Sequence, residues 1–446
     1  MSRWAIFACA ALLGACLAWA DDESLDYAAS GSLRVRGFSL RSRTLDRDLD
    51  PTTRLSLRLS GDDELDATQH FLDTRLRLQL RVTAYDQVSA HLAIEVGDIT
   101  FGVAKQGGAL GTDGVVFENK NLYLEWHPTR YSFTLRAGLY PRESDPYGLV
   151  LSDDVAGLHG EVELLGTGTE LYADFIKAVE NSRVDLDSDG IPDNDYNDRT
   201  VFLAGVRSRA LGLLDLEGFG IADIDNTQDS PVAANVERDV YWGGLSASVR
   251  VGPARLSSTG IYAGGKRSQP GSPGVRIRGF AVDNRLTLSL PFFTLEAIFA
   301  WASGRDPSRT STNTAFPTIA PFYGASGIVY SNFGGLNATG SNLSGTAHTT
   351  LKLRSSPTDG LDIEAVFLWA WYTSDRDVSQ NVNRFNADAR DLGFEADLNV
   401  TYEIAPGFKT FARGSLFFPG HGYVVQRDTR RRGALSMVIL GAQFSF

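Results

Sequence analysis

The feature that most constrains this fold is a strict alternation of apolar and polar side chains between residues 74 and 97. Apolar residues occupy every second position, and most positions between them are charged or polar. The pattern breaks once, at Tyr85-Asp86-Gln87, and then resumes. Because successive side chains of a strand point to opposite faces, this period of two predicts one antiparallel hairpin with an apolar and a polar face.

The same alternation returns along the chain in segments of about 9 to 14 residues. Such segments exceed the usual strands of soluble sheets and match the length that crosses a bilayer at a tilt. Eighteen strands are predicted, at residues 32–41, 74–84, 88–97, 117–127, 131–141, 155–165, 168–178, 200–210, 212–222, 239–250, 254–263, 276–290, 292–302, 344–354, 360–373, 391–404, 407–418 and 434–446. After residue 20 no run of about 18 uncharged apolar residues occurs, which excludes a helical membrane protein.

The connections between these segments alternate in length. The short ones fall at 85–87, 128–130, 166–167, 211, 251–253, 291, 355–359 and 405–406, and the long ones at 42–73, 98–116, 142–154, 179–199, 223–238, 264–275, 303–343, 374–390 and 419–433. Outer-membrane barrels place short turns in the periplasm and long loops outside. The sequence therefore predicts an all-β, transmembrane, antiparallel up-and-down β-barrel of about 18 strands, with both termini in the periplasm. Arg54–Leu59 is assigned to the first loop, because an extra strand would separate the termini.

Two further features fit a membrane barrel. Aromatic residues stand near predicted strand ends, where an interfacial girdle requires them, at Trp126, Tyr131, Trp301, Trp369, Trp371 and Tyr402. The chain ends in Gly441-Ala442-Gln443-Phe444-Ser445-Phe446, the Gly-x-x-aromatic-x-aromatic ending that outer-membrane barrels present to their assembly machinery. The competing interpretation makes the aromatics part of the core of a soluble β-solenoid or sandwich.

Residues 1–20 have the form of a secretory signal peptide. Arg3 precedes an apolar run that ends in Ala18-Trp19-Ala20, a small-x-small cleavage pattern. The mature barrel domain is predicted at 21–446. An alternative is acylation at Cys16, because Leu13-Gly14-Ala15-Cys16 resembles a bacterial lipoprotein box. Both cysteines, Cys9 and Cys16, lie in this segment, so the mature chain has no thiol for a disulfide, a metal site or catalysis.

The net charge of -12 excludes nucleic acid as a general partner, because a protein that neutralises phosphates needs an excess of basic residues. Basic residues nevertheless gather on one face of the early strands. If the apolar face meets lipid, the lumen is lined by Arg34, Arg36, Arg75, Arg77, Arg81 and Arg136. Guanidinium groups stay charged and offer a planar fork of donors to carboxylates or phosphates. This wall predicts a path for an anionic solute.

The alternative is that these arginines pair with acids and only hold the barrel in shape. The late strands supply acids on the corresponding face, at Asp362, Glu364, Glu395, Asp397 and Glu403. A basic wall that faces an acidic wall is also the arrangement of many nonspecific porins. Long loops such as 303–343 or 142–154 are expected to fold inward and narrow the pore.

An acidic loop at 185–198 has the spacing of a calcium site. Asp185, Asp187, Asp189 and Asp193 occupy positions 1, 3, 5 and 9, with Gly190 at position 6 and Ile191 offering a backbone carbonyl. Position 12 is Tyr196 and not the bidentate glutamate of an EF-hand, so the loop is closer to the Asp-rich calcium repeats of extracellular proteins. The alternative is a solvated acidic loop.

No enzyme motif is present in the sequence. The six histidines are scattered, and neither His-Glu-x-x-His nor Gly-x-Ser-x-Gly occurs. The protein is predicted not to be an enzyme. A barrel hydrolase could still assemble a serine and His91 or His159 from neighbouring strands.

Several short motifs resemble the alginate export family of outer-membrane channels. They are Ser32-Leu33-Arg34-Val35-Arg36, Thr74-Arg75-Leu76-Arg77-Leu78, Glu95-Val96-Gly97-Asp98 and Arg136-Ala137-Gly138-Leu139-Tyr140. In the last of these, Gly138 stands where the family often has Gly-Arg-Gln. The resemblance implies an 18-stranded barrel with an arginine-rich lumen that passes a polyuronate outward. It also implies periplasmic partners, namely a scaffold lipoprotein and polymer-modifying enzymes.

These observations predict a Gram-negative outer-membrane channel that contacts membrane lipid and passes anionic solutes by passive diffusion along the arginines. The expected solute is a carboxylated saccharide or polyuronate. The alternatives are a general or small-carboxylate uptake porin, and a surface binding or catalytic barrel plugged by its loops. Calcium at 185–193 is the one expected cofactor.

Overall fold

The computed structural model describes residues 25–42, 67–103, 117–164, 166–179, 198–209, 212–226, 237–269, 272–306, 308–330, 341–374, 390–420 and 434–446. The predicted signal peptide, the segment Arg54–Leu59 and the calcium loop at 185–193 lie outside these residues. No helix in the described part of the chain is long and apolar enough to cross a membrane.

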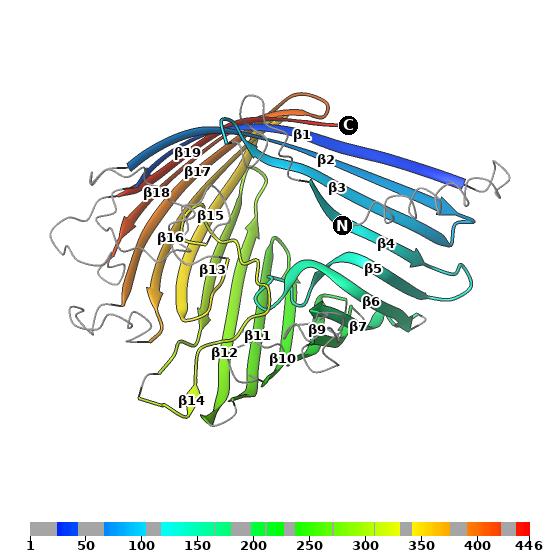
Figure 1. The fold of residues 1–446 in the computed structure, drawn as a ribbon. Coiled ribbons are helices and arrows are strands. Elements are labelled where there is room, and N and C mark those ends of the chain that lie inside the picture. The colour runs from blue at the N-terminus through cyan, green and yellow to red at the C-terminus, as the bar shows by residue number, and fades with distance from the viewer. Residues whose placement is uncertain are drawn as a thin grey trace.

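The described residues form one closed β-barrel (Figure 1). The first strands are β1 (Leu25–Ser42), β2 (Ala67–Ala84), β3 (Val88–Thr100), β4 (Phe117–Trp126), β5 (Phe133–Glu143), β6 (Ser152–Leu164), β7 (Thr169–Val179), β8 (Arg199–Ser208) and β9 (Leu214–Asp225). The others are β10 (Glu237–Val251), β11 (Ala254–Gln269), β12 (Ser272–Ser289), β13 (Thr294–Ala302), β14 (Thr312–Asn313), β15 (Thr346–Thr358), β16 (Leu361–Tyr372), β17 (Asp391–Ala405), β18 (Phe408–Pro419) and β19 (Leu435–Ser445).

Each long strand pairs antiparallel with the next, and β19 closes the ring by pairing antiparallel with β1. The two-residue β14 stands outside this ring and pairs in parallel with β12, so β13 pairs directly with β15. The prediction of an 18-stranded antiparallel barrel is confirmed. Closure leaves no free sheet edge, so the backbone polar groups of the strands are hydrogen-bonded to one another, as lipid requires.

The outer face is apolar because alternate side chains of each strand point away from the lumen. Leu33 on β1, Trp369 on β16 and Leu440 on β19 are each about half exposed. The residues directly before and after each of them in the strand are more covered. The described start of β1 lies beside the turn at Tyr85-Asp86-Gln87, and the backbone amide of Gly31 donates to the carbonyl of Phe446. Both described ends therefore lie at the short-turn end of the barrel.

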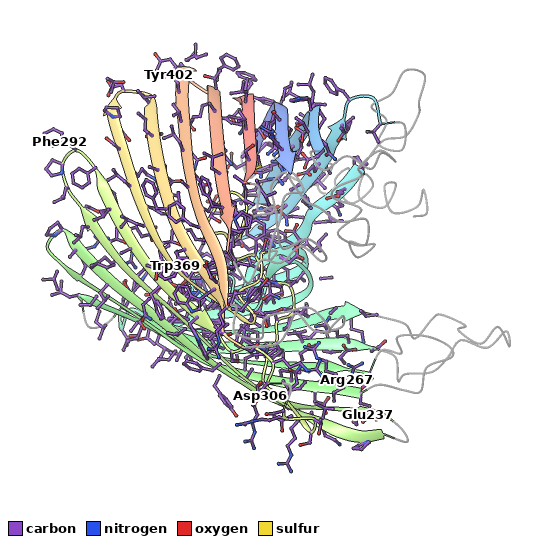
Figure 2. The ribbon with its side chains drawn as sticks, turned by 90° about the vertical axis from the view of Figure 1, so that its left-hand side faces the viewer. Glu237, Arg267, Phe292, Asp306, Trp369 and Tyr402 are labelled. Atoms are coloured by element: carbon purple, nitrogen blue, oxygen red, sulfur yellow. The ribbon has the colours of Figure 1, made fainter. Side chains whose placement is uncertain are left out.

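The prediction of a loop at 264–275 was wrong. Strands β11 and β12 continue through it to Gln269 and Ser272 and form a hairpin that extends beyond β13, while β10 pairs with β11 up to Ser268. Figure 2 places Arg267 on this hairpin, at the end opposite to Phe292 and Tyr402. Above the bilayer no lipid faces the strands, so the hydrogen-bond ladder continues after the apolar alternation has stopped.

Candidate functional site

Two long connections fold into the barrel and meet inside it. One is the segment 144–151 between β5 and β6, and the other is the segment 316–330 between β13 and β15; together we call them the inner bridge. Their strands lie on opposite walls of the closed ring, and Figure 1 shows both segments crossing its interior. Leu149, Val150, Ile328 and Val329 are buried almost completely. The expected infolding of these loops is therefore found.

Backbone hydrogen bonds join the two halves of the inner bridge. The amides of Ile319 and Ala320 donate to the carbonyl of Val150, at 3.0 and 3.1 Å, and the amide of Phe322 donates to the carbonyl of Gly148 at 3.0 Å. The amide of Ser152 completes the pairing with the carbonyl of Ala320 at 2.8 Å. The bridge thus connects opposite walls through main-chain contacts, which do not depend on particular side chains.

Asp145 holds the first half of the bridge in its turn. Its carboxylate accepts hydrogen bonds from the backbone amides of Tyr147, Leu149 and Val150, at 3.0 to 3.2 Å, and from the Ser144 hydroxyl at 3.0 Å. Burial raises the pKa of Asp145, and the three amides and the hydroxyl oppose that shift because they favour the charged form. One buried side chain therefore satisfies four donors of the loop.

Tyr323 fastens the second half of the bridge to the wall. Its hydroxyl donates to Asp283 on β12 at 2.8 Å and lies 2.7 Å from Nε2 of His348 on β15. Burial raises the pKa of Tyr323 well above its ordinary value, and the Asp283 carboxylate adds to this effect. Arg285 pairs with the same Asp283 and places its guanidinium 3.6 Å from the centre of the Tyr147 ring. These contacts tie both halves of the bridge to one point of the wall.

Glu395 and Asp397 on β17 anchor the bridge a second time. Glu395 accepts hydrogen bonds from the Ser326 hydroxyl and from the amides of Ile328 and Val329, at 2.7, 2.5 and 2.8 Å. Asp397 accepts one from the amide of Gly327 at 2.9 Å. The sequence had suggested these two acids for an acidic wall facing the arginines. In the structure they hold backbone donors instead.

Four of the predicted arginines share a cluster of three acids on the inner face of β1 to β3. Arg36 makes a bidentate pair with the buried Asp73, and Arg34 pairs with Asp98 at 2.8 Å. Arg75 and Arg77 both approach Glu95, Arg77 by a hydrogen bond and Arg75 at 3.7 Å. These side chains lie on neighbouring strands, so the pairing runs along the wall and not across the pore.

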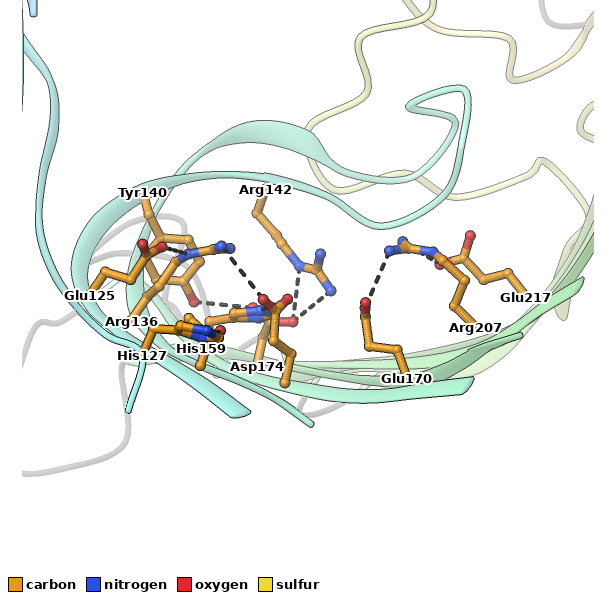
Figure 3. A network of polar contacts seen from close by, with 12 residues as sticks. Glu125, His127, Arg136, Tyr140, Arg142, His159, Glu170, Asp174, Arg207 and Glu217 are labelled. Atoms are coloured by element: carbon orange, nitrogen blue, oxygen red, sulfur yellow. Dashed lines mark hydrogen bonds and ion pairs between the residues drawn. The ribbon is translucent and has the colours of Figure 1, made fainter. Parts of the chain in front are cut away.

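The other two predicted arginines stand apart from that cluster. Arg136 on β5 pairs with Glu125 on β4 at 2.7 Å and lies 3.7 Å from Glu161 on β6. Figure 3 shows this contact as one end of a network that continues through Asp174. Arg81 is exposed and reaches only the Ser89 hydroxyl, at 3.4 Å; among the described residues it has no carboxylate partner.

The two histidines that were considered for catalysis have other partners in the structure. Both ring nitrogens of His159 face carboxylates, Asp174 at 2.8 Å and Glu161 at 3.1 Å. His91 stacks on Tyr123 with ring centres 4.4 Å apart. Within the described ranges neither histidine forms a hydrogen bond with a serine.

Sequence reasoning missed two basic residues of the late strands, Lys352 on β15 and Arg413 on β18. Both line a cavity of about 300 Å³ beneath the bridge tip at 324–327. Lys352 makes no ion pair with any described residue. The missed signal is the same alternation, because Lys352 stands between Leu351 and Leu353, which are both exposed on the outer face.

A second cavity, of about 270 Å³, lies on the other side of the bridge. Strands β8 to β11 line it with Arg207, Arg255, Asp215 and Glu217, and the bridge contributes Tyr147. Arg207 bonds Glu217 at 3.0 Å and lies 3.3 Å from Glu170, as Figure 3 shows. Acids and arginines are therefore mixed on this side of the lumen.

Comparison with known proteins agrees with the fold. No family model and no curated protein matches the chain. Among solved structures, OccK8 (OprE) of Pseudomonas aeruginosa has a TM-score of 0.55 at 12% identity, covering 94% of this chain and 98% of that chain. OccAB1 of Acinetobacter baumannii has 0.53 at 10% identity, with 94% and 97% covered. The outer membrane protein OpdK of Pseudomonas aeruginosa has 0.52 at 12% identity, with 94% and 98% covered.

The TM-scores and the coverage show a shared fold over nearly the whole length, at low sequence identity. They support the predicted outer-membrane barrel and do not single out the alginate export family. A closed barrel with an apolar outer face has the structure that spans an outer membrane. The chain is a multi-pass β-barrel of the Gram-negative outer membrane.

Proposed function

We propose that this protein is a porin that passes small carboxylated solutes, such as a sugar acid or a short uronate oligomer, by passive diffusion. The observation that carries the proposal is the arginine cluster of β1 and β2, in which four arginines share three acids. The 300 Å³ cavity adds further charged groups to the lumen, namely Lys352, Arg354 and Arg413 together with Asp362, Glu364 and Asp397. Low-dielectric walls focus the field of such charges and concentrate anions. In the β1 to β3 cluster basic residues outnumber acids, although the whole chain carries a net charge of -12.

The inner bridge favours a small solute over a polymer. It joins opposite walls by backbone hydrogen bonds, so a long chain would have to pass beside it. A cavity of about 300 Å³ is at the lower end of the size range of small-molecule sites. Passive passage of small solutes requires no periplasmic scaffold lipoprotein. The proposal keeps the predicted role of the lumenal arginines in guiding anions and adds Lys352 and Arg413 to them. Those arginines are Arg34, Arg36, Arg75, Arg77, Arg81 and Arg136.

The test is conductance of the refolded protein in a planar bilayer with a salt gradient. We expect a reversal potential that indicates anion preference, and a concentration-dependent block by glucuronate that glucose does not produce. The double variant K352Q/R413Q should lose part of both effects. The control R130Q removes an exposed arginine of a periplasmic turn and should lose neither.

Other outcomes would contradict the proposal. Cation preference of the wild-type channel would refute the role of the basic wall. Block by polyuronate at lower uronate concentration than by glucuronate would favour the polymer channel. Absence of conductance from a folded barrel would favour a plugged binding barrel.

A further inference from the structure

The extracellular end of the β11–β12 hairpin carries three basic residues on its outer face. They are Lys266 on β11 and Arg276 and Arg278 on β12, and we call them the outer cationic patch. All three are exposed, whereas Ile277, between the two arginines, is buried. A Cβ atom on the neighbouring Gly279 would meet Phe316 and Pro317 of the bridge, so that face points inward. The patch therefore lies on the face that also carries Tyr262 and Phe280.

The patch lies just beyond the membrane-facing band. On β12 and the turn that follows, Phe280 and Leu290 both face outward and are both about two-fifths exposed. The ten residue steps from Phe280 to Leu290 span about 33 Å of strand, or about 25 Å at a tilt of about 40°, which equals the height of the apolar band. Arg278 then lies about 5 Å above Phe280 and Arg276 about 10 Å above it. Both heights fall within the headgroup layer of the membrane.

Two of the like charges of the patch face each other across the hairpin. Lys266 and Arg276 are direct cross-strand partners, and like charges in that position destabilise a sheet. Asp239 is the register partner of Lys266 on the other side, on β10, but it forms no ion pair with Lys266. In the described part of the chain none of the three basic residues has an ion-pair partner. The predicted lumenal arginines, by contrast, nearly all have acids beside them.

We propose that the outer cationic patch binds the phosphate groups of an anionic glycolipid headgroup in the outer leaflet of the membrane. The aromatic rings of Tyr262 and Phe280 would contact the upper acyl chains, and the basic groups would reach the phosphates above them. Guanidinium groups bind phosphate oxygens through paired donors, and the lysine adds a point charge. A bound phosphate also removes the repulsion between Lys266 and Arg276. This inference is independent of what the lumen conducts.

The test titrates the refolded barrel in zwitterionic detergent with lipid A, followed by native mass spectrometry. One arm uses bisphosphorylated lipid A and the other uses dephosphorylated lipid A. Each basic residue near an anionic surface contributes about fivefold in affinity. We therefore expect the triple variant K266Q/R276Q/R278Q to bind the bisphosphorylated form on the order of a hundredfold more weakly than wild type, and the dephosphorylated form with unchanged affinity.

Two variants guard the interpretation. The control R130Q/R309Q/K409Q removes three exposed basic residues elsewhere and should bind as wild type does. The variant R276K/R278K keeps the charge and should retain most of the affinity, which separates loss of charge from loss of fold. Heat-modifiable migration on gels reports folding of each variant.

Three results would overturn the proposal. They are equal binding of the two lipid A forms by wild type, undiminished binding by the folded triple variant, and displacement of lipid A by millimolar inorganic phosphate, which would indicate a site for free phosphate. Channel conductance of the triple variant should equal that of wild type. A failure here therefore leaves the porin proposal intact, and the reverse also holds.

Discussion

Glu395 is expected to keep the inner bridge in place, and the variant E395A tests this. The side chain is fully buried and accepts hydrogen bonds from the Ser326 hydroxyl and the amides of Ile328 and Val329. A hydrogen bond contributes about 0.5 to 1.5 kcal/mol, and a buried donor left unsatisfied costs about 1 to 3 kcal/mol. Three buried donors left unsatisfied therefore destabilise this part of the bridge by on the order of 4 kcal/mol.

A change of that size shifts the equilibrium between attached and detached bridge tip by about a thousandfold. The other anchors of the bridge, at Tyr323 and at Asp145, remain, so we expect detachment of residues 326–329 and not of the whole bridge. Single-channel recordings should show a larger mean conductance and frequent transitions between levels. The barrel should still fold, because its ring of strand pairs is unchanged.

The matched variants make the interpretation specific. E395Q keeps one carbonyl oxygen and can satisfy two of the three donors, so its recordings should lie between those of wild type and E395A. E163A removes an exposed acid at the periplasmic end of β6 and should behave as wild type. If E395A conducts at the wild-type level without added transitions, Glu395 does not hold the constriction.

Three further predictions concern stability and pH. R36Q leaves the buried Asp73 without its bidentate partner and should lower the unfolding free energy by on the order of 3 kcal/mol in urea titrations. R81Q should leave the unfolding free energy unchanged and reduce anion preference. Equal loss of stability in the two variants would contradict the assigned pairing. Y323F removes the hydroxyl that donates to a buried aspartate and should cost about 1 to 3 kcal/mol in the same titration, and an unchanged midpoint would argue against that contact. Because burial raises the pKa of Asp145, its protonation stabilises the fold fully below the unfolded pKa of about 4, and this contribution is lost as pH rises through the folded pKa. The melting temperature of wild type minus that of D145N should therefore fall between pH 4 and pH 8, and a constant difference would contradict the raised pKa.

The barrel could be predicted from the sequence because lipid and lumen impose opposite requirements on alternate residues. Leu351, Lys352 and Leu353 show this rule on one strand: the two leucines are exposed to lipid and the lysine lines the cavity. The rule fails where no lipid is present. Residues 264–269 belong to β11, but Gly264 and Gly265 carry no side chain and Lys266 and Arg267 are both exposed, so only the backbone ladder defines the strand.

The inner bridge could be expected from loop length, but its contacts could not be predicted. Ile319 and Val150 are far apart in sequence and meet through backbone atoms, which leave no trace in side-chain periodicity. The role of Glu395 was hidden for the same reason. An acid on the lumenal face of a strand has one sequence signature, whether it repels a solute, pairs with an arginine or accepts backbone amides.

The bridge also divides the lumen into two sides, and only one of them can attract anions. On the β1 to β3 side of the lumen, four arginines share three acids, so positive charge is in excess there. On the β7 to β9 side, Arg199 and Arg207 face four acids, at Asp223, Asp225, Glu170 and Glu217. Anions should therefore be attracted to one side of the bridge and repelled from the other. An anion preference that survived neutralisation of Lys352 and Arg413 would have to come from the early-strand arginines, because the opposite wall is acidic.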